Sequence, residues 1–327
     1  MICVDCFQNE GLRRSALKEA ATRVRTKCER CGNVGYVLSK SELQRLSYVF
    51  FVSGSVPPYQ PHGTPMVQVS EDRNRGDQVR PGGTLRHDFD LLQSEIDFSL
   101  FYYGPAEWRL GYTEPHAALE AGGEQAAEAL AHLLSITSSI ELPTGSLLYR
   151  IRLGEVSADA AAFDPPPRDI RRGGRFDTPE MDVLYVSLDI ETCLHECRVT
   201  VVDEVVLATL RTAVPLSLLD LAGEINEDRS KTPFEDLRYT LPSLFYAGAE
   251  EYDCCRKISG AVRAAGYDGF VYPSYFSFVG AGSTYNIALF GRPLENGSVI
   301  IQSLNRLRLG KVSYEYEFGP VIAELTA

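Results

Sequence analysis

The stretch GGRFDTPEMDVLYVSLDIETCLHEC, residues 173–197, contains a turn, a strand and a helix in close succession. The Gly-Gly pair at its start indicates a tight turn. The apolar run Val183–Ser187 has the length and the β-branched content of a strand. From Ile190 to Thr200 the pattern predicts a helix. This part of the chain therefore combines both kinds of element.

Strands and helices mix irregularly on either side of this stretch. A further helix is expected at Tyr252–Ala265. Apolar runs of strand length lie at Leu147–Leu153, Val205–Leu210, Phe270–Tyr272, Tyr285–Phe290 and Val299–Gln302. Because regular strand–helix–strand units are lacking, the sequence predicts an α+β domain over residues 143–327. A conventional dinucleotide-binding motif is not found, since Gly280-Ala281-Gly282 lacks the third glycine and precedes a strand.

Three segments of this domain carry the polar residues that suggest chemistry. They are LLYRIR at 147–152, residues 173–197, and GYDGFVYPS at 266–274, which is followed by NIALF at 286–290. In this order they resemble the RES family, named for its Arg, Glu and Ser. That family has a Tyr-Arg start, a GGRW-type segment, a Leu-Tyr strand, a helix bearing Glu and an aromatic-Pro-Ser turn. Phe176 and Asp177 stand where the family has Trp and Asn.

The resemblance implies a fold similar to the ADP-ribosyltransferases and an activity that consumes NAD+. It implies that Arg150 and Arg175 bind NAD+, whose diphosphate a guanidinium can grip with two hydrogen bonds. Glu196 would stabilise the oxocarbenium-like ribose that forms as nicotinamide leaves. Ser274 would act with it by binding the ribose or the amide, or by positioning a water. Tyr185 would stack on the nicotinamide ring.

The acceptor of the ADP-ribosyl group stays open at this point. Water would make the protein an NAD+ glycohydrolase and phosphate would make it a phosphorylase, and we expect one of these two. A side chain or a base as acceptor would make it an ADP-ribosyltransferase that modifies a protein or a nucleic acid. The resemblance also implies a toxin or defence effector, with an antitoxin or another regulatory protein as partner.

Four cysteines near the N-terminus form two pairs, Cys3-x2-Cys6 and Cys28-x2-Cys31, with 21 residues between the pairs. Two such pairs supply the four thiolates of a tetrahedral zinc site. Because four thiolates leave no open position, the expected zinc is structural and not catalytic. The pattern predicts a zinc-binding module over residues 1–45, which resembles the HEPN/RES N-terminal extension.

Residues 46–142 are predicted to form a connecting, partly helical region. Helices are expected at 88–103 and 116–137, whereas 54–83 is rich in Pro and Gly and predicts an irregular segment. Arg109 and His116 have the spacing of a HEPN-type ribonuclease pair, which is a second alternative function. The residues between them favour a loop, and that motif requires a helix.

Composition limits the remaining classes of function. The net charge of −12 and the pI near 5.0 argue against a surface that binds nucleic acid. No apolar run approaches the roughly 20 residues of a transmembrane helix, and no signal peptide is recognisable at the start. We therefore expect a cytoplasmic protein without a membrane partner. In a reducing compartment Cys193 and Cys197 are expected to be small buried groups.

Overall fold

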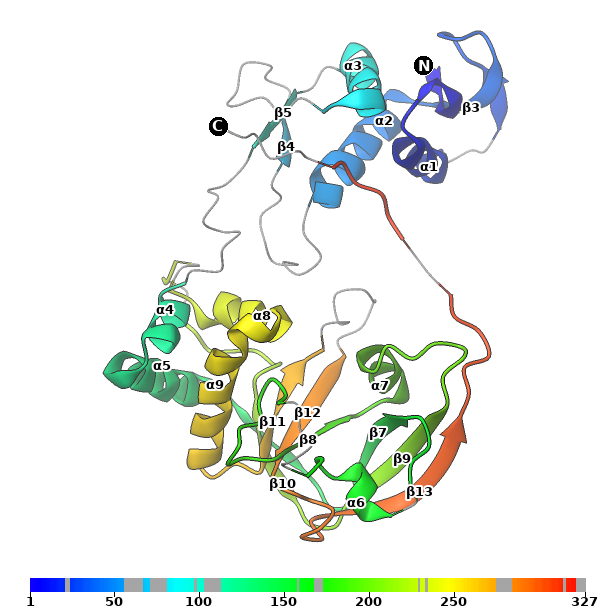
Figure 1. Cartoon of the computed structure of the whole chain (residues 1–327). Coiled ribbons are helices and arrows are strands. Elements are labelled where there is room, and N and C mark those ends of the chain that lie inside the picture. The colour runs from blue at the N-terminus through cyan, green and yellow to red at the C-terminus, as the bar shows by residue number, and fades with distance from the viewer. Residues whose placement is uncertain are drawn as a thin grey trace. The chain divides into compact units, whose positions relative to one another are not determined.

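The computed structural model (Figure 1) describes residues 1–20, 24–55, 67–70, 81–96, 99–102, 113–157, 159–167, 173–228, 230–232, 235–274, 284–313 and 316–321. Contacts divide the chain into two units. The first unit combines Met1–Arg109 with Tyr314–Ala327, and the second unit is Leu110–Ser313. The division into residues 1–45, 46–142 and 143–327 stays a prediction.

In its described residues the first unit contains a three-stranded antiparallel sheet in the order β1-β3-β2, a two-stranded sheet of β4 and β5, and three helices. A capping box between Ser39 and Glu42 starts its second helix. The elements are β1 (Ile2–Cys3), a 3-10 turn (Val4–Cys6), α1 (Glu10–Glu19), β2 (Arg25–Lys27), β3 (Val34–Leu38), α2 (Lys40–Ser47), two further turns (Tyr48–Val52, Ser53–Ser55), β4 (Val67–Ser70), α3 (Gly83–Ile96) and β5 (Ser99–Tyr102).

Residues from both ends of the chain complete the first unit. Its core joins apolar residues of α1, α2 and α3, with Phe318 packed against it. A β-carbon on Gly11 would lie 3.0 Å from the Phe318 ring, and one on Gly54 would lie 2.6 Å from Gly319 Cα. The segment around Phe318 therefore fits closely against two glycines of the N-terminal part.

Two expectations for the first unit are wrong in part. The helix predicted over 88–103 ends at Ile96, because Ser99–Tyr102 instead forms β5, which pairs antiparallel with β4. These residues have apolar spacing that also fits a helix, and pairing with β4 provides their backbone hydrogen bonds instead. Periodicity alone therefore did not distinguish a strand from a helix here. Consequently the segment 54–83, predicted to be irregular, contains β4.

The second unit is built on a mixed sheet of eight strands in the order β13-β9-β7-β8-β12-β11-β10-β6. All of its pairs are antiparallel except β10 with β11. The strands are β6 (Ser139–Leu142), β7 (Leu147–Leu153), β8 (Val183–Ser187), β9 (Val205–Thr212), β10 (Leu216–Asp220), β11 (Gly269–Pro273), β12 (Tyr285–Phe290) and β13 (Val299–Leu307). The predicted α+β class is confirmed.

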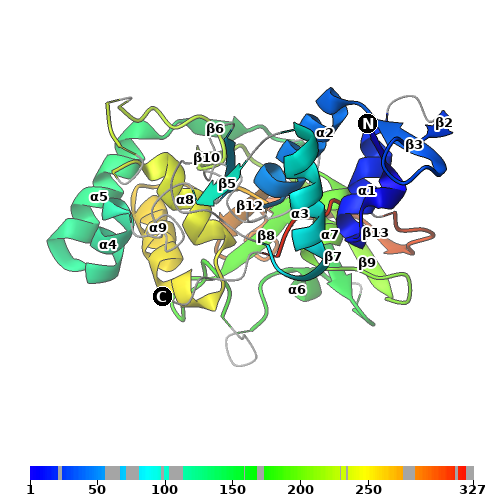
Figure 2. The same cartoon turned by 90° about the horizontal axis from the view of Figure 1, so that it is seen from above.

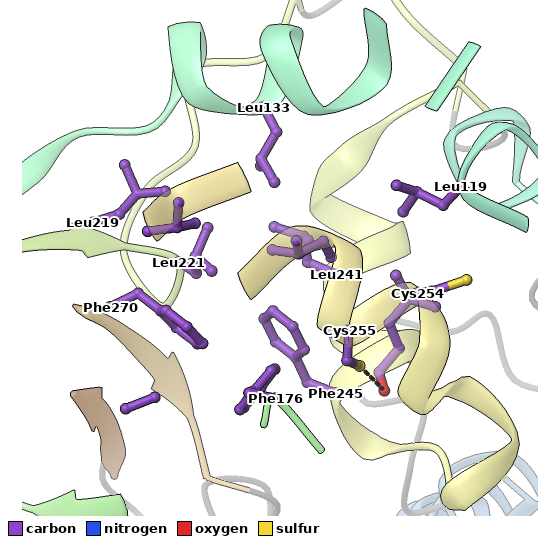
Figure 3. Packing of buried hydrophobic residues seen from close by; sticks show 14 of the residues in the cluster. Leu119, Leu133, Phe176, Leu219, Leu221, Leu241, Phe245, Cys254, Cys255 and Phe270 are labelled. Carbon is purple, nitrogen blue, oxygen red and sulfur yellow. Dashed lines mark hydrogen bonds between the residues drawn. The ribbon is translucent and has the colours of Figure 1, made fainter. Parts of the chain in front are cut away.

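Most helices cover one face of this sheet in two groups (Figures 1 and 2), whereas Phe163 of the short helix α6 packs on the other face. The helices are α4 (Glu114–Ala121), α5 (Gly123–Ile136), α6 (Ala160–Phe163), α7 (Ile190–Glu196), α8 (Leu237–Tyr246), a 3-10 turn (Ala249–Glu251) and α9 (Tyr252–Ala264). The group α4, α5, α8 and α9 packs on β8, β12, β11 and β10 around Phe176 and Phe270 (Figure 3). Separately, α7 packs on β7 and β9.

Sequence periodicity missed or merged several elements of the second unit. The helix predicted over 116–137 is two helices, because Gly122 adopts φ 73° between them. Glu114 and Pro115 lie within α4, so the loop expected between Arg109 and His116 is wrong at these two residues. Neither β10 nor α8 was predicted. Within the described residues no helix combines the length and the apolar character needed to cross a bilayer.

Candidate active site

A row of polar side chains crosses four neighbouring strands of the second unit. The register pairs Tyr149 with Ser187, Ser187 with Asn286, and Asn286 with Tyr272. Paired residues project from the same face of a sheet. The next row consists of Tyr185, Ala288 and Phe270 and belongs to the apolar cluster under α8 and α9. The polar row therefore lies between that cluster and α7, which packs against Tyr149.

Glu196 ends α7 beside this row. The helix starts at Asp189, whose carboxylate accepts a hydrogen bond of 2.6 Å from the Thr192 amide. At its other end Glu196 Oε1 accepts from Ser274 Oγ and from Asn286 Nδ2, both at 2.6 Å. Both donors are buried, whereas the Glu196 side chain is exposed.

The two hydrogen bonds reach the same carboxylate oxygen. No hydrogen bond from the described residues reaches Glu196 Oε2. One oxygen is therefore held by two buried donors from β12 and from the end of β11. This arrangement suits a carboxylate that must meet a developing positive charge at a defined position.

Tyrosines surround the carboxylate. Burial and the charge of Glu196 raise the pKa of Tyr246. Burial raises the pKa of Tyr272 as well, and the neighbouring Tyr185 and Glu196 raise it further. Glu196 thus lies within electrostatic reach of Tyr246 and Tyr272, and Tyr185 lies within reach of Tyr272. The site thus has an aromatic wall, which suits a flat ring, including one that carries positive charge.

Tyr185 holds the turn that opens the GGRFD segment. Its hydroxyl accepts from the Phe176 amide at 3.0 Å and donates to Asp177 Oδ1 at 3.1 Å. A β-carbon on Gly174 would lie 2.2 Å from that Asp177 oxygen, so glycine is required there. Asp177, which departs from the family pattern, therefore has a defined role as acceptor for Tyr185. The predicted stacking of Tyr185 on nicotinamide stays a prediction.

Phe176, the other departure from the family pattern, is a core residue. Its ring lies 4.8 Å from the Phe270 ring and 4.9 Å from the Tyr272 ring, both edge to face. Burying a ring of this size stabilises a fold by roughly 2–3 kcal/mol. Phenylalanine has no N–H that would need a partner in this cluster, so it fills the position without further hydrogen bonds.

Arg175 joins the site to the end of α8. Its guanidinium donates to Leu244 O at 2.8 Å and to Ala247 O at 2.7 Å, and it lies 5.0 Å from the centre of the Tyr252 ring. A cation at a helix C-terminus satisfies free carbonyl groups and the helix dipole. The charge of Arg175 lowers the pKa of Tyr272 against the larger effect of burial, which places it near the tyrosine wall.

Arg150 occupies a different place. It is 7% exposed, and its Nη1 donates to Tyr185 O at 2.5 Å. Burial lowers the pKa of Arg150 to about 9. It follows Tyr149 in β7, so it leaves the strand on the face opposite the polar row. The only register pair between β7 and β8 is Tyr149 with Ser187, and the guanidinium therefore ties the two strands where they separate.

The structure thus brings Glu196 and Ser274 together, with Arg175 and Tyr185 nearby, and places Arg150 behind the site. Asn286, Tyr246 and Tyr272 are additional site residues that were not predicted. Asn286 could have been found from the sequence, because it is a polar residue inside the apolar run YNIALF. Tyr246 had none, because α8 itself was not expected.

The four predicted zinc ligands meet in the first unit. Cys3 Sγ lies 3.6 Å from the sulfurs of Cys6 and Cys31, and Cys6 Sγ lies 3.7 Å from that of Cys28. Tetrahedral zinc with Zn–S bonds of about 2.3 Å requires sulfurs about 3.8 Å apart. Although burial opposes ionisation, backbone N–H donors lower the pKa of Cys28 to about 6. The cluster therefore fits the geometry of a zinc site.

The ribonuclease pair is not supported by the placement of its histidine. His116 is 4% exposed, and its Nε2 lies 2.8 Å from Glu251 Oε2. A general acid or base must reach its substrate, and a side chain this deeply buried does not. Arg109, the other member of the pair, lies outside the described residues.

Comparisons with known proteins concern mainly the second unit. Residues 147–309 match the family described as RES domain. A chain in the crystal structure of the M. tuberculosis MbcT–MbcA toxin–antitoxin complex is similar at 16% identity with a TM-score of 0.35, over 55% of this chain and 91% of that one. No curated protein matches the sequence. The family match excludes the N-terminal cysteines, so the resemblance to a HEPN/RES extension is unsupported.

Proposed function

We propose that this chain, a member of the RES domain family through residues 147–309, cleaves the bond between nicotinamide and ribose in NAD+. The observation that carries the proposal is the carboxylate of Glu196. Its Oε1 is fixed by Ser274 and Asn286, and its side chain is otherwise exposed. A carboxylate held in this way stabilises the ribosyl cation that develops as the C–N bond breaks.

The surrounding residues suit the other parts of the substrate. Tyr246 and Tyr272 offer an aromatic wall close to Glu196 for the nicotinamide ring. Arg175 uses two N–H groups on carbonyls of α8, and a guanidinium has five. Another contact of Arg175 is with the Cys255 thiol, and the N–H groups left over would bind the diphosphate. Arg150 contributes indirectly, by holding the backbone of Tyr185.

We propose water or phosphate as the acceptor of the ADP-ribosyl group, which makes the protein a glycohydrolase or a phosphorylase. The biological role we propose is that of a toxin or defence effector restrained by an antitoxin or another regulatory protein. Support for this role comes from the RES family resemblance. The four cysteines of the first unit would hold one structural zinc, since their geometry leaves no open coordination position.

The test uses the full-length protein and NAD+ labelled in the adenylate half. Nicotinamide and free ADP-ribose are expected on chromatography, with a phosphorylated ADP-ribose instead if phosphate is supplied and is the acceptor. Label retained on a protein or nucleic acid, in an amount equal to the nicotinamide released, would establish the transferase alternative. Absence of nicotinamide release from folded protein under all of these conditions would overturn the proposal.

A further inference from the structure

A second group of metal-ligating side chains lies in the second unit, away from Glu196. His116 comes from α4, Glu251 ends the short turn before α9, and Cys254 lies in the first turn of α9. One ligand atom from each of the three lies within 4.8 Å of the other two. The closest pair, His116 Nε2 and Glu251 Oε2, is 2.8 Å apart.

The group is shielded from solvent. His116 and Cys254 are each 4% exposed, and the side chain of Glu251 is 20% exposed. The two cysteines at the start of α9 differ in their surroundings. Cys255 Sγ donates to Leu244 O within the apolar cluster, whereas the Cys254 sulfur lies on the side of Leu119 and α4 (Figure 3). The thiol is therefore turned toward the helix that carries His116.

The charges around Cys254 favour a cation. The carboxylates of Glu251, Glu120 and Asp253 all lie within electrostatic reach of the Cys254 sulfur. The nearest opposing charge is Lys257, whose ammonium group donates to Leu119 O at 2.5 Å. Three carboxylates against one ammonium leave the thiol in a negative environment. A cation bound among these carboxylates would offset their negative charge.

The three ligands favour some metal ions over others. A thiolate, an imidazole and a carboxylate together match the preferences of zinc, whereas calcium and magnesium prefer oxygen ligands alone. Separations below 4.8 Å are compatible with bonds of about 2.0–2.3 Å to a common ion after small side-chain movements. Three protein ligands leave the fourth tetrahedral position for water.

We propose that His116, Glu251 and Cys254 bind one zinc ion, in addition to the four-cysteine site. The ion joins α4 to the start of α9. Tyr252, over which the Arg175 guanidinium lies, is placed between two of the ligands in the sequence. Binding of the ion therefore stabilises the helical layer on which Arg175 rests, without placing the metal among the reacting atoms.

The experiment measures zinc per chain by elemental analysis of the full-length protein, after saturation with zinc and desalting. About two equivalents are expected for the unaltered protein and for Cys193→Ser, a buried cysteine on α7 that serves as control. Cys254→Ser and Glu251→Gln are each expected to hold about one equivalent. Cys28→Ser is also expected to hold about one, since it removes the other site.

The zinc contents of these variants, compared with one another, distinguish the two metal sites. Retention of two equivalents by folded Cys254→Ser and Glu251→Gln would overturn the proposal, as would one equivalent in the unaltered protein that Cys28→Ser abolishes. One equivalent that persists in Cys28→Ser but is lost in Cys254→Ser would support the new site and disprove the four-cysteine one. If Cys254→Ser fails to fold, as judged by circular dichroism, the near-isosteric Glu251→Gln decides.

Discussion

The cysteine cluster of the first unit and the Glu196 site of the second unit are assembled in opposite ways. In the cluster, Cys3 and Cys6 are three positions apart, and each pair is delivered by one local turn. In the site, Ser274 and Asn286 reach Glu196 from 78 and 90 positions away. Local spacing therefore suffices to recognise the cluster, whereas the site depends on the register of the sheet.

The two sites therefore depend on different parts of the fold in order to form. The cluster can form wherever its two turns can approach one another, and a metal would supply the energy that holds them. The Glu196 site exists only when β8, β12 and β11 pair in their observed register, since a shift of one residue would send Asn286 to the opposite face. Changes to either site should consequently leave the other one intact. The first two of the three predictions below test this independence, and the third concerns the two arginines of the second unit.

The largest effect is expected for Glu196→Gln. The amide keeps the size of the side chain but removes the negative charge that stabilises the ribosyl cation, so turnover should fall by about 10²-fold or more. Nicotinamide release measures the loss. Zinc content should stay unchanged, because Glu196 is not one of the cysteine ligands. The melting temperature should change little, because the amide oxygen of Gln can still accept from Ser274 and Asn286.

Glu191→Gln on the same helix is the matched control for this variant. Glu191 is exposed in the first turn of α7, outside the site, and its replacement should leave turnover unaltered. Near-normal turnover in folded Glu196→Gln would show that the Glu196 carboxylate takes no part in the reaction. The row of polar side chains beside it would then have no proposed function.

The second effect concerns Cys28→Ser. Loss of one of four ligands should release the zinc of the cluster and loosen the first unit, because binding energy of a structural zinc is folding energy. Elemental analysis and limited proteolysis of residues 1–55 measure the two consequences. Turnover of NAD+ should persist, because Glu196 is held within the second unit alone. Full zinc retention in the variant would contradict the structural role.

The comparison also explains how much could be predicted from the sequence. Strands such as Leu147–Leu153, Val183–Ser187 and Tyr285–Phe290 were predicted with their observed bounds, because each is a short apolar run between turn residues. The cysteine ligands were found by spacing alone. Glu196 and Ser274 were found only through the family resemblance.

The remaining features have no local signal. β10 is parallel to β11, and each paired residue of β11 is 51 positions away, so nothing in Leu216–Asp220 itself identifies the strand. β5 was read as helix because its apolar residues continue the stripe of α3. The position of Arg150 behind the site depends on where β7 and β8 separate. A sequence motif carries no information about that separation.

The smallest of the three effects separates the two arginines. Arg175→Ala should raise KM for NAD+ by about tenfold, which corresponds to about 1.4 kcal/mol of binding, while kcat changes less. The reason is that the proposed grip on the diphosphate exists in the ground state as well as in the transition state. Arg175→Lys keeps the charge but loses the planar fork, so an intermediate KM is expected.

Arg150→Ala should behave differently, because its guanidinium is buried and bonds to Tyr185 O inside the sheet. Removing it leaves a cavity and a carbonyl without its donor, which together lower the melting temperature by several degrees. Any loss of activity should follow the loss of folded protein, so KM measured on the folded fraction should stay close to normal. A raised KM at unchanged stability would mean that Arg150 contacts NAD+ directly, as the family pattern implied. Unchanged KM with lowered stability in Arg175→Ala would make Arg175 a purely structural cap of α8. These two outcomes together would reverse the assignment of the arginines while leaving Glu196 as it is.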